Sequence, residues 1–157
     1  MNINQLIDQD HVLCCPEVAS KKRLLEVVSE LLAVDLPQIS AHEIFDSLIN
    51  REKLGSTGLG KGVAIPHGRI ASLENPVCAF IRLDEAVEFD ATDGKPVDLA
   101  FALLVPEDST EEHLQVLSTI AELFSDEEFC IGVRNCKDRD CLMQLLINRR
   151  DVQQIPA

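Results

Sequence analysis

Apolar residues recur at helical spacing in the N-terminal part of the chain. Between Ser20 and Pro37 they predict an amphipathic helix that ends before the proline, with a buried face made of Leu24, Leu25, Val27, Val28, Leu31 and Leu32. Ser40 and Glu43 form a capping box, so a second helix is expected to start there and to bury Ile44, Phe45, Leu48 and Ile49. Residues 1–18 mix apolar and acidic positions and predict a short helix followed by a turn.

Strand-like patterns occupy the middle of the chain. Residues 77–83 and 97–105 are strand-like, and the second run is apolar on both faces, which predicts a central strand of a sheet. Residues 63–66 should be extended, because a proline restricts the residue before it. The alternation at 87–89 predicts a short edge strand, and Asp93-Gly94-Lys95-Pro96 predicts a turn.

Helical patterns return in the last third of the chain. A second capping box at 109–112 predicts a helix with a buried stripe, and residues 126–133 and 138–148 predict two more. Helices on either side of a few strands describe an α/β domain, and we expect one domain over residues 1–157. His113 follows the loop after the strand that ends at Val105 by one helical turn. That loop lies at a sheet edge where such folds bind ligands.

The charge excludes some functions. The formal net charge of −13 over 157 residues argues against sequence-independent nucleic-acid binding, which depends on lysine and arginine neutralising phosphates. The longest apolar run, Leu99–Val105, is too short to cross a bilayer, and the N-terminus lacks the pattern of a signal peptide. We therefore expect a cytoplasmic protein without membrane insertion.

The six cysteines are expected to remain thiols in a reducing compartment. A zinc site would have to start from the groups His11, Cys14 and Cys15, or Cys136 and Cys141, but no Cys-x-x-Cys pair occurs. No metal and no cofactor are therefore expected.

A glycine-rich run from Gly55 to Gly62 leads to His67 and carries the candidate chemistry. Gly55 to Lys61 satisfies the nucleotide-loop pattern G-x-x-x-x-G-K, but Gly62 stands where that loop needs a serine or threonine for Mg²⁺. Hydrolysis by a serine, threonine or cysteine activated by His67 stays open, although no Gly-x-Ser-x-Gly elbow is present. In a third interpretation, His67 itself accepts a phosphoryl group on a ring nitrogen, and glycine amides with Arg51 or Lys61 hold the phosphoryl oxygens.

The run Leu-Gly-Ser-Thr-Gly-Leu-Gly-Lys-Gly-Val-Ala-Ile-Pro-His-Gly, residues 54–68, resembles the active-site signature of the fructose/mannitol-type IIA domains of the bacterial phosphotransferase system. The resemblance extends over the whole chain, including Glu-Glu-His-Leu around His113. It implies a mixed β-sheet flanked by helices on both faces. The implied activity is that of a protein-histidine phosphotransferase component.

The resemblance also implies residue roles. His67 would be phosphorylated at Nε2, His113 would be the second active-site histidine, and Arg51 would face the phosphate. The residues expected to form the phosphate loop are Gly55, Ser56, Thr57, Gly58, Gly60 and Gly62.

Within the family, a free-standing domain of this length resembles the nitrogen-regulatory branch most. This branch implies a small histidine phosphocarrier protein as phosphoryl donor. It also implies regulated targets such as sensor kinases or potassium transport components. The alternative is a sugar-specific IIA component that passes phosphate to a IIB domain for sugar uptake.

Overall fold

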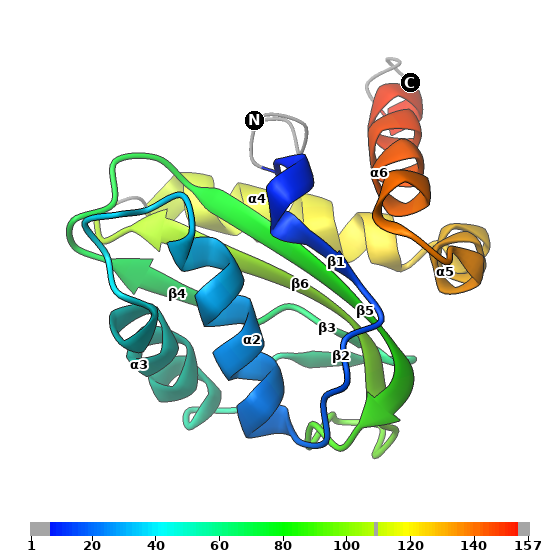
Figure 1. Ribbon diagram of the computed structural model, residues 1–157, viewed down its shortest axis with the longest axis horizontal. Coiled ribbons are helices and arrows are strands. Elements are labelled where there is room, and N and C mark those ends of the chain that lie inside the picture. Colours follow the sequence, from blue (N-terminus) through cyan, green and yellow to red (C-terminus); the bar gives the residue numbers. More distant parts are fainter. Residues whose placement is uncertain (1–6, 109, 154–157) are drawn as a thin grey trace.

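A six-stranded sheet forms the middle layer of the fold, and helices cover both of its faces (Figure 1). The computed structural model describes residues 7–108 and 110–153, without the side chains of residues 110, 112, 113 and 149–153. In chain order the elements are η1 Gln9–His11, β1 Val12–Cys14, α2 Lys21–Ala33, α3 Ala41–Glu52, β2 Gly58–Gly60, β3 Val63–Ala64, β4 His67–Ile70, β5 Val77–Val87, β6 Val97–Pro106, α4 Thr110–Phe124, α5 Glu127–Asn135 and α6 Arg139–Gln153.

Strand β6 is the centre of the sheet. The strand order is β1-β5-β6-β3-β2, with β4 also paired to β6. On one side β6 pairs antiparallel with β5, and on the other it pairs in parallel first with β3 and then with β4. The sheet is therefore mixed, and the central position expected for residues 97–105 is confirmed.

The sheet separates two hydrophobic cores, and this explains why β6 is apolar throughout. Alternate side chains of a strand point to opposite faces. Thus Leu99, Phe101, Leu103 and Val105 pack in the core that contains Val116, Ile120 and Phe124 of α4. Ala100, Ala102 and Leu104 pack in the other core, with Leu24 of α2 and Leu48 of α3. The predicted helices on both faces are confirmed.

The two N-terminal helices each begin directly after a capping serine, of which the one at Ser40 was predicted. The Ser40 hydroxyl accepts a hydrogen bond from the Glu43 amide at 3.0 Å, and the Ser20 hydroxyl accepts one from the Arg23 amide at 3.1 Å. Helix α2 ends at Ala33, before Pro37. The predicted stop and start are both confirmed.

The chain differs from the sequence-based expectation in four short segments. Of the expected N-terminal helix, residues 1–6 lie outside the described residues, and the rest forms one turn of η1 followed by strand β1. Strands β2 and β4 were not expected, and residues 87–89 form no separate edge strand because β5 itself runs to Val87. Strands of three or four residues carry too few positions for a period-2 pattern, so pairing with neighbouring strands decides them.

One expectation about the cysteines is wrong. Cys136 and Cys141 form a disulfide, with their Cα atoms 5.5 Å apart. Helix α5 ends at Asn135 and α6 begins at Arg139, so the turn between the helices brings the two thiols together. Cys14, Cys15, Cys78 and Cys130 are free thiols.

Candidate functional site

His67 is the first residue of β4, and its side chain is half-buried. The histidine lines a surface hollow of about 510 Å³ between α3 and β4, together with Ser47, Asn50, Arg51, Leu54, Gly68 and Arg69. Pairing of His67 with Leu103 in the central strand fixes its backbone. The backbone of His67 is therefore held by the sheet, while the residue lines the hollow.

A backbone hydrogen bond sets the tautomer of the His67 ring. Its Nδ1 lies 2.9 Å from the carbonyl oxygen of Ile65. Since a carbonyl oxygen only accepts, Nδ1 carries the proton. In the neutral ring the lone pair then belongs to Nε2, which is the nucleophilic nitrogen.

The surroundings of His67 favour its neutral form. Burial of the ring, the largest influence, lowers the pKa of His67 below its usual 6.5, and the positive charges of Arg51 and Arg69 lower it further. The Ile65 carbonyl and the Glu52 carboxylate act in the opposite direction. At neutral pH the ring is therefore uncharged.

Two arginines line the same hollow. Arg51, in the last turn of α3, donates from Nη1 to the Gly55 carbonyl at 2.8 Å. Arg69 is exposed on β4, two residues after His67. The sequence analysis predicted Arg51 but missed Arg69, although residues i and i+2 of a strand lie on one face.

The structure divides the glycine run into two parts. Gly55 contacts Arg51, but Gly60 and Gly62 flank the turn at the far end of the β2–β3 hairpin. Along β6, Val63 pairs with Leu99 and His67 with Leu103. At about 3.3 Å per residue, the turn lies on the order of 13 Å from His67.

The turn residues have structural contacts of their own. The Lys61 amide donates to the Asp93 carboxylate at 2.8 Å, and Arg134 donates from Nη2 to the Lys61 carbonyl at 2.8 Å. Gly62 has a φ of +83°, and a Cβ there would lie 2.6 Å from Nη2 of Arg134. The turn therefore requires a glycine for backbone reasons, without reference to any phosphate.

The amides of the nearer part are also engaged. The Thr57 amide donates to the Glu52 carboxylate at 2.9 Å, and the Gly58 amide donates to the Ser56 hydroxyl at 3.0 Å. The structure thus places Gly55, Ser56 and Thr57 behind His67 as a support. Glu52 is a buried residue that the sequence analysis did not identify.

His113 lies in α4, the helix that follows β6. Its side chain is outside the described part of the chain, so its position relative to His67 is not shown. Within the described residues, no group of three or more histidine, cysteine or acidic side chains is arranged to hold a metal ion. Among the described helices, none is both long and apolar enough to span a membrane.

Comparisons with known proteins identify the family of the chain. Residues 5–149 match the family described as phosphoenolpyruvate-dependent sugar phosphotransferase system, EIIA 2. The chain belongs to this EIIA 2 family. It is 41% identical over 153 residues to a nitrogen regulatory protein of Pseudomonas aeruginosa, covering 98% of this chain and 99% of the relative.

Solved structures of EIIA proteins share the fold. The crystal structure of nitrogen regulatory protein IIA-Ntr from Neisseria meningitidis is similar with a TM-score of 0.86 and 46% identity, over 92% of this chain and 98% of that one. The mannitol IIA of Escherichia coli, at 20% identity, has a TM-score of 0.74 over 88% of this chain and 97% of that one, which shows a common fold. The predicted fructose/mannitol-type IIA fold is confirmed.

Proposed function

We propose that this chain is a regulatory IIA protein that accepts a phosphoryl group on Nε2 of His67 from a small histidine phosphocarrier protein. One observation carries the proposal: the Nδ1–H of His67 is bonded to Ile65, which leaves Nε2 with the lone pair in a hollow that two arginines line. Similarity over nearly the full length to a nitrogen regulatory protein supports the regulatory role.

The reaction is an exchange between two imidazoles. The lone pair on Nε2 of His67 forms the new N–P bond while the N–P bond in the donor breaks, and the donor ring keeps that electron pair. Arg51 and Arg69 would stabilise the charge on the phosphoryl oxygens, because guanidinium groups pair well with phosphate. Positioning and charge stabilisation supply the catalysis.

In this proposal Gly55, Ser56, Thr57 and Gly58 act on the phosphoryl site indirectly, because the amides of Thr57 and Gly58 are already bonded to Glu52 and Ser56. His113, on the helix after β6, is the second active-site histidine. Gly60 and Gly62 shape the hairpin turn. Phosphorylation adds up to about two negative charges to the hollow, which changes the surface that a partner meets. The regulated partners would be proteins such as sensor kinases or potassium transport components.

The test uses a phosphocarrier protein labelled on its histidine. Acid-labile label should move to the wild-type chain and to His42→Ala, an exposed histidine on α3 that serves as control. It should be absent from His67→Ala. Label retained by His67→Ala would refute the assignment, and rapid transfer onward to a sugar-specific IIB domain would favour the sugar-uptake alternative.

A further inference from the structure

Two charged residues next to the site lie at the wrong ends of their helices. Lys21 is the first residue of α2, where the helix dipole disfavours a cation, and Glu52 is the last residue of α3, where it disfavours an anion. Neither charge stabilises its own helix. Their placement is explained by what they contact.

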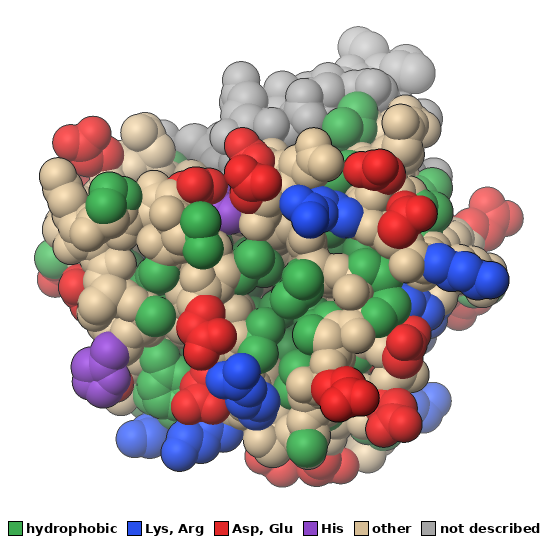
Figure 2. Space-filling model, viewed as in Figure 1, with side chains coloured by type: hydrophobic (Ala, Val, Ile, Leu, Met, Phe, Trp, Pro, Cys, Tyr) green, Lys and Arg blue, Asp and Glu red, His purple; other side chains and the backbone are tan. Residues whose placement is uncertain are grey.

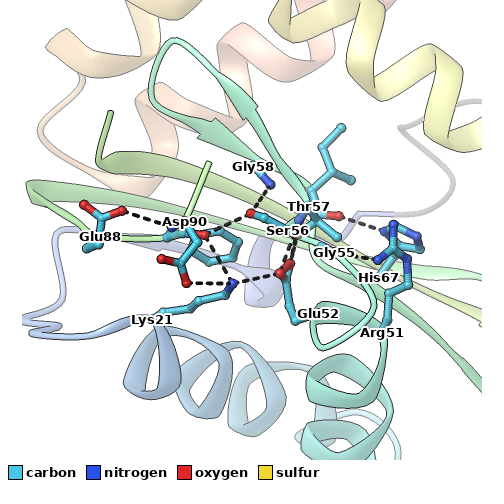
Figure 3. A network of polar contacts seen from close by, with 12 residues as sticks. Lys21, Arg51, Glu52, Gly55, Ser56, Thr57, Gly58, His67, Glu88 and Asp90 are labelled. Carbon is cyan, nitrogen blue, oxygen red and sulfur yellow. Dashed lines mark hydrogen bonds and ion pairs between the residues drawn. The ribbon is translucent and has the colours of Figure 1, made fainter. Parts of the chain in front are cut away.

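The two residues form a buried ion pair with additional partners (Figure 3). Nζ of Lys21 lies 3.0 Å from Oε2 of Glu52, whose side chain is only 2% exposed. The same ammonium donates to the Phe89 carbonyl at 3.2 Å and lies 4.5 Å from the centre of the Phe89 ring. Burying a carboxylate is costly unless it is paired and hydrogen-bonded, and here it is both.

Glu52 holds one residue of the support behind His67. Its Oε1 accepts from the Thr57 amide at 2.9 Å and also from the Thr57 hydroxyl. Oε2 lies 3.2 Å from the same amide. Both polar hydrogens of Thr57 therefore point at one carboxylate, which fixes the direction of the Thr57 peptide.

Thr57 is connected to the His67 ring by two further hydrogen bonds. The Thr57 carbonyl accepts from the Ile65 amide at 3.0 Å, and the Ile65 carbonyl accepts from Nδ1–H of His67 at 2.9 Å. Pro66 restricts the backbone of Ile65. The orientation of the Ile65 carbonyl thus depends on Thr57 on one side and on a proline on the other.

We propose that Glu52, held by Lys21, is a positioning residue that keeps the Ile65 carbonyl directed at Nδ1 and so keeps His67 in the tautomer whose lone pair lies on Nε2. The consequence for phosphoryl transfer rests on the function proposed above, but the tautomer itself does not. The competing interpretation is that the ion pair only stabilises the junction between α2, α3 and the hairpin.

The charge of Glu52 has a second effect on His67, which is electrostatic and independent of the positioning role. Its carboxylate raises the pKa of His67, against the lowering by burial. Removing the charge should therefore lower that pKa further.

The first measurement needs no phosphoryl donor. The ¹⁵N chemical shifts of the His67 ring identify which nitrogen is protonated in the neutral form. We expect Nδ1–H to dominate in the wild-type chain. A wild-type ring protonated on Nε2 would overturn the proposal.

The second measurement compares Glu52→Gln with Asp98→Asn. Asp98 forms a matched ion pair with Arg134, with N–O distances of 2.9 Å, at the far end of the same hairpin. Glu52→Gln should mix the two tautomers, lower the pKa of His67 and slow label transfer about 10- to 100-fold, as misplacement of a reacting group does. Asp98→Asn should keep the wild-type tautomer and pKa even if it is less stable.

A double variant, Lys21→Met with Glu52→Gln, also removes the ammonium that has lost its closest carboxylate partner, and it should show the same tautomer change. If either variant folds and keeps the Nδ1–H tautomer together with wild-type transfer, the proposal is wrong. If the tautomer changes as expected but no protein, wild type included, accepts label, the positioning role stands and the proposed function fails.

Discussion

At the scale of single residues, the reactivity of His67 results from two opposing influences. Burial and two arginines disfavour the charged ring, while the Ile65 carbonyl and Glu52 favour it. The influences that lower the pKa prevail, so the ring is neutral at neutral pH. A nucleophilic imidazole requires this state, because protonation removes the lone pair.

The pH dependence of phosphoryl acceptance follows from this balance. The pKa of His67 is below 6.5, so acceptance should fall to half of its value at neutral pH only below pH 6.5, as the ring gains its proton. The same shift affects stability, because the unfolded chain binds the proton more readily. The free energy of unfolding should therefore decrease as pH falls from 6.5 through the folded-state pKa.

An NMR titration of the His67 ring, followed by transfer rates over the same pH range, checks the prediction. A midpoint above 6.5 would contradict it.

Arg51 should affect transfer more than folding. Arg51→Gln removes a guanidinium that faces the hollow, and we expect label transfer to slow about 10- to 100-fold, since interactions that stabilise developing charge contribute strongly to rate. Because the residue is only partly buried, the free energy of unfolding should change by about 1 kcal/mol or less. The control is Arg23→Gln, which changes an exposed arginine on α2. Equal rates of label transfer in the two variants would show that Arg51 has no role in the site.

At the scale of elements, the contact between α3 and β4 determines the shape of the hollow. The Ser47 hydroxyl donates to the Arg69 carbonyl at 2.9 Å, and Gly68 lies directly against Ser47. A Cβ on Gly68 would meet the Ser47 side chain and would lie 3.2 Å from its backbone carbon. No other residue fits there without moving the helix.

Gly68→Ala should therefore lower the free energy of unfolding by about 1–3 kcal/mol, the usual cost of overpacking. Urea denaturation measures this loss. Gly94→Ser, at an open turn with φ of +71° and nothing within 4 Å of the added atom, separates backbone strain from steric crowding. Gly68 is not among the glycines with positive φ, so a Gly68→Ala variant as stable as the wild type would contradict the crowding prediction.

How far the sequence predicts the fold depends on the length of each element. Helices α2 and α3 have capping serines and long apolar stripes, so their starts and buried faces could be predicted. Strands β1 and β4 have only three and four residues. Strand β1 forms by pairing with β5, and β4 forms by pairing with β6. Pairing between distant segments leaves little pattern in the local sequence, so these strands could not be predicted.

The same distinction applies to the site. His67 and Arg51 could be named from the sequence because the motif of residues 54–68 contains His67 and begins shortly after Arg51. Lys21 and Glu52 are separated by a helix and a turn, and only the fold brings them together. Gly60 and Gly62 belong to the motif but lie at the other end of a hairpin, so nearness in sequence overstated their nearness to His67.

At the scale of the whole molecule, the net charge is negative, and the acidic side chains are dispersed on the face that Figure 2 shows. Figure 2 shows acidic side chains dispersed among apolar and uncharged ones over the face covered by α2 and α3, and no single acidic patch dominates it. With a net charge of −13, such a surface favours basic or neutral partners at long range.

The disulfide is the second feature at this scale. It joins the end of α5 to the start of α6 across 5 positions. A disulfide that closes a short loop removes little entropy from the unfolded chain. The usual relation between loop length and entropy gives a stabilisation of about 2 kcal/mol for a loop of this size. Cys136→Ser should therefore lower the free energy of unfolding by about 2 kcal/mol without changing label transfer, as measured by thermal melts and transfer assays. A variant as stable as the oxidised wild type would show that the bond contributes nothing.

The last turn of α3 carries both Arg51, which faces the hollow, and Glu52, which faces the interior. Helix ends fray, and local opening needs far less free energy than global unfolding. Opening this one turn would release the arginine and the buried carboxylate together, giving a locally open state in which the sheet stays intact. Amide hydrogen exchange at Lys53, Leu54 and Gly55, whose N–H groups bond back to that turn, reports how often the chain visits it.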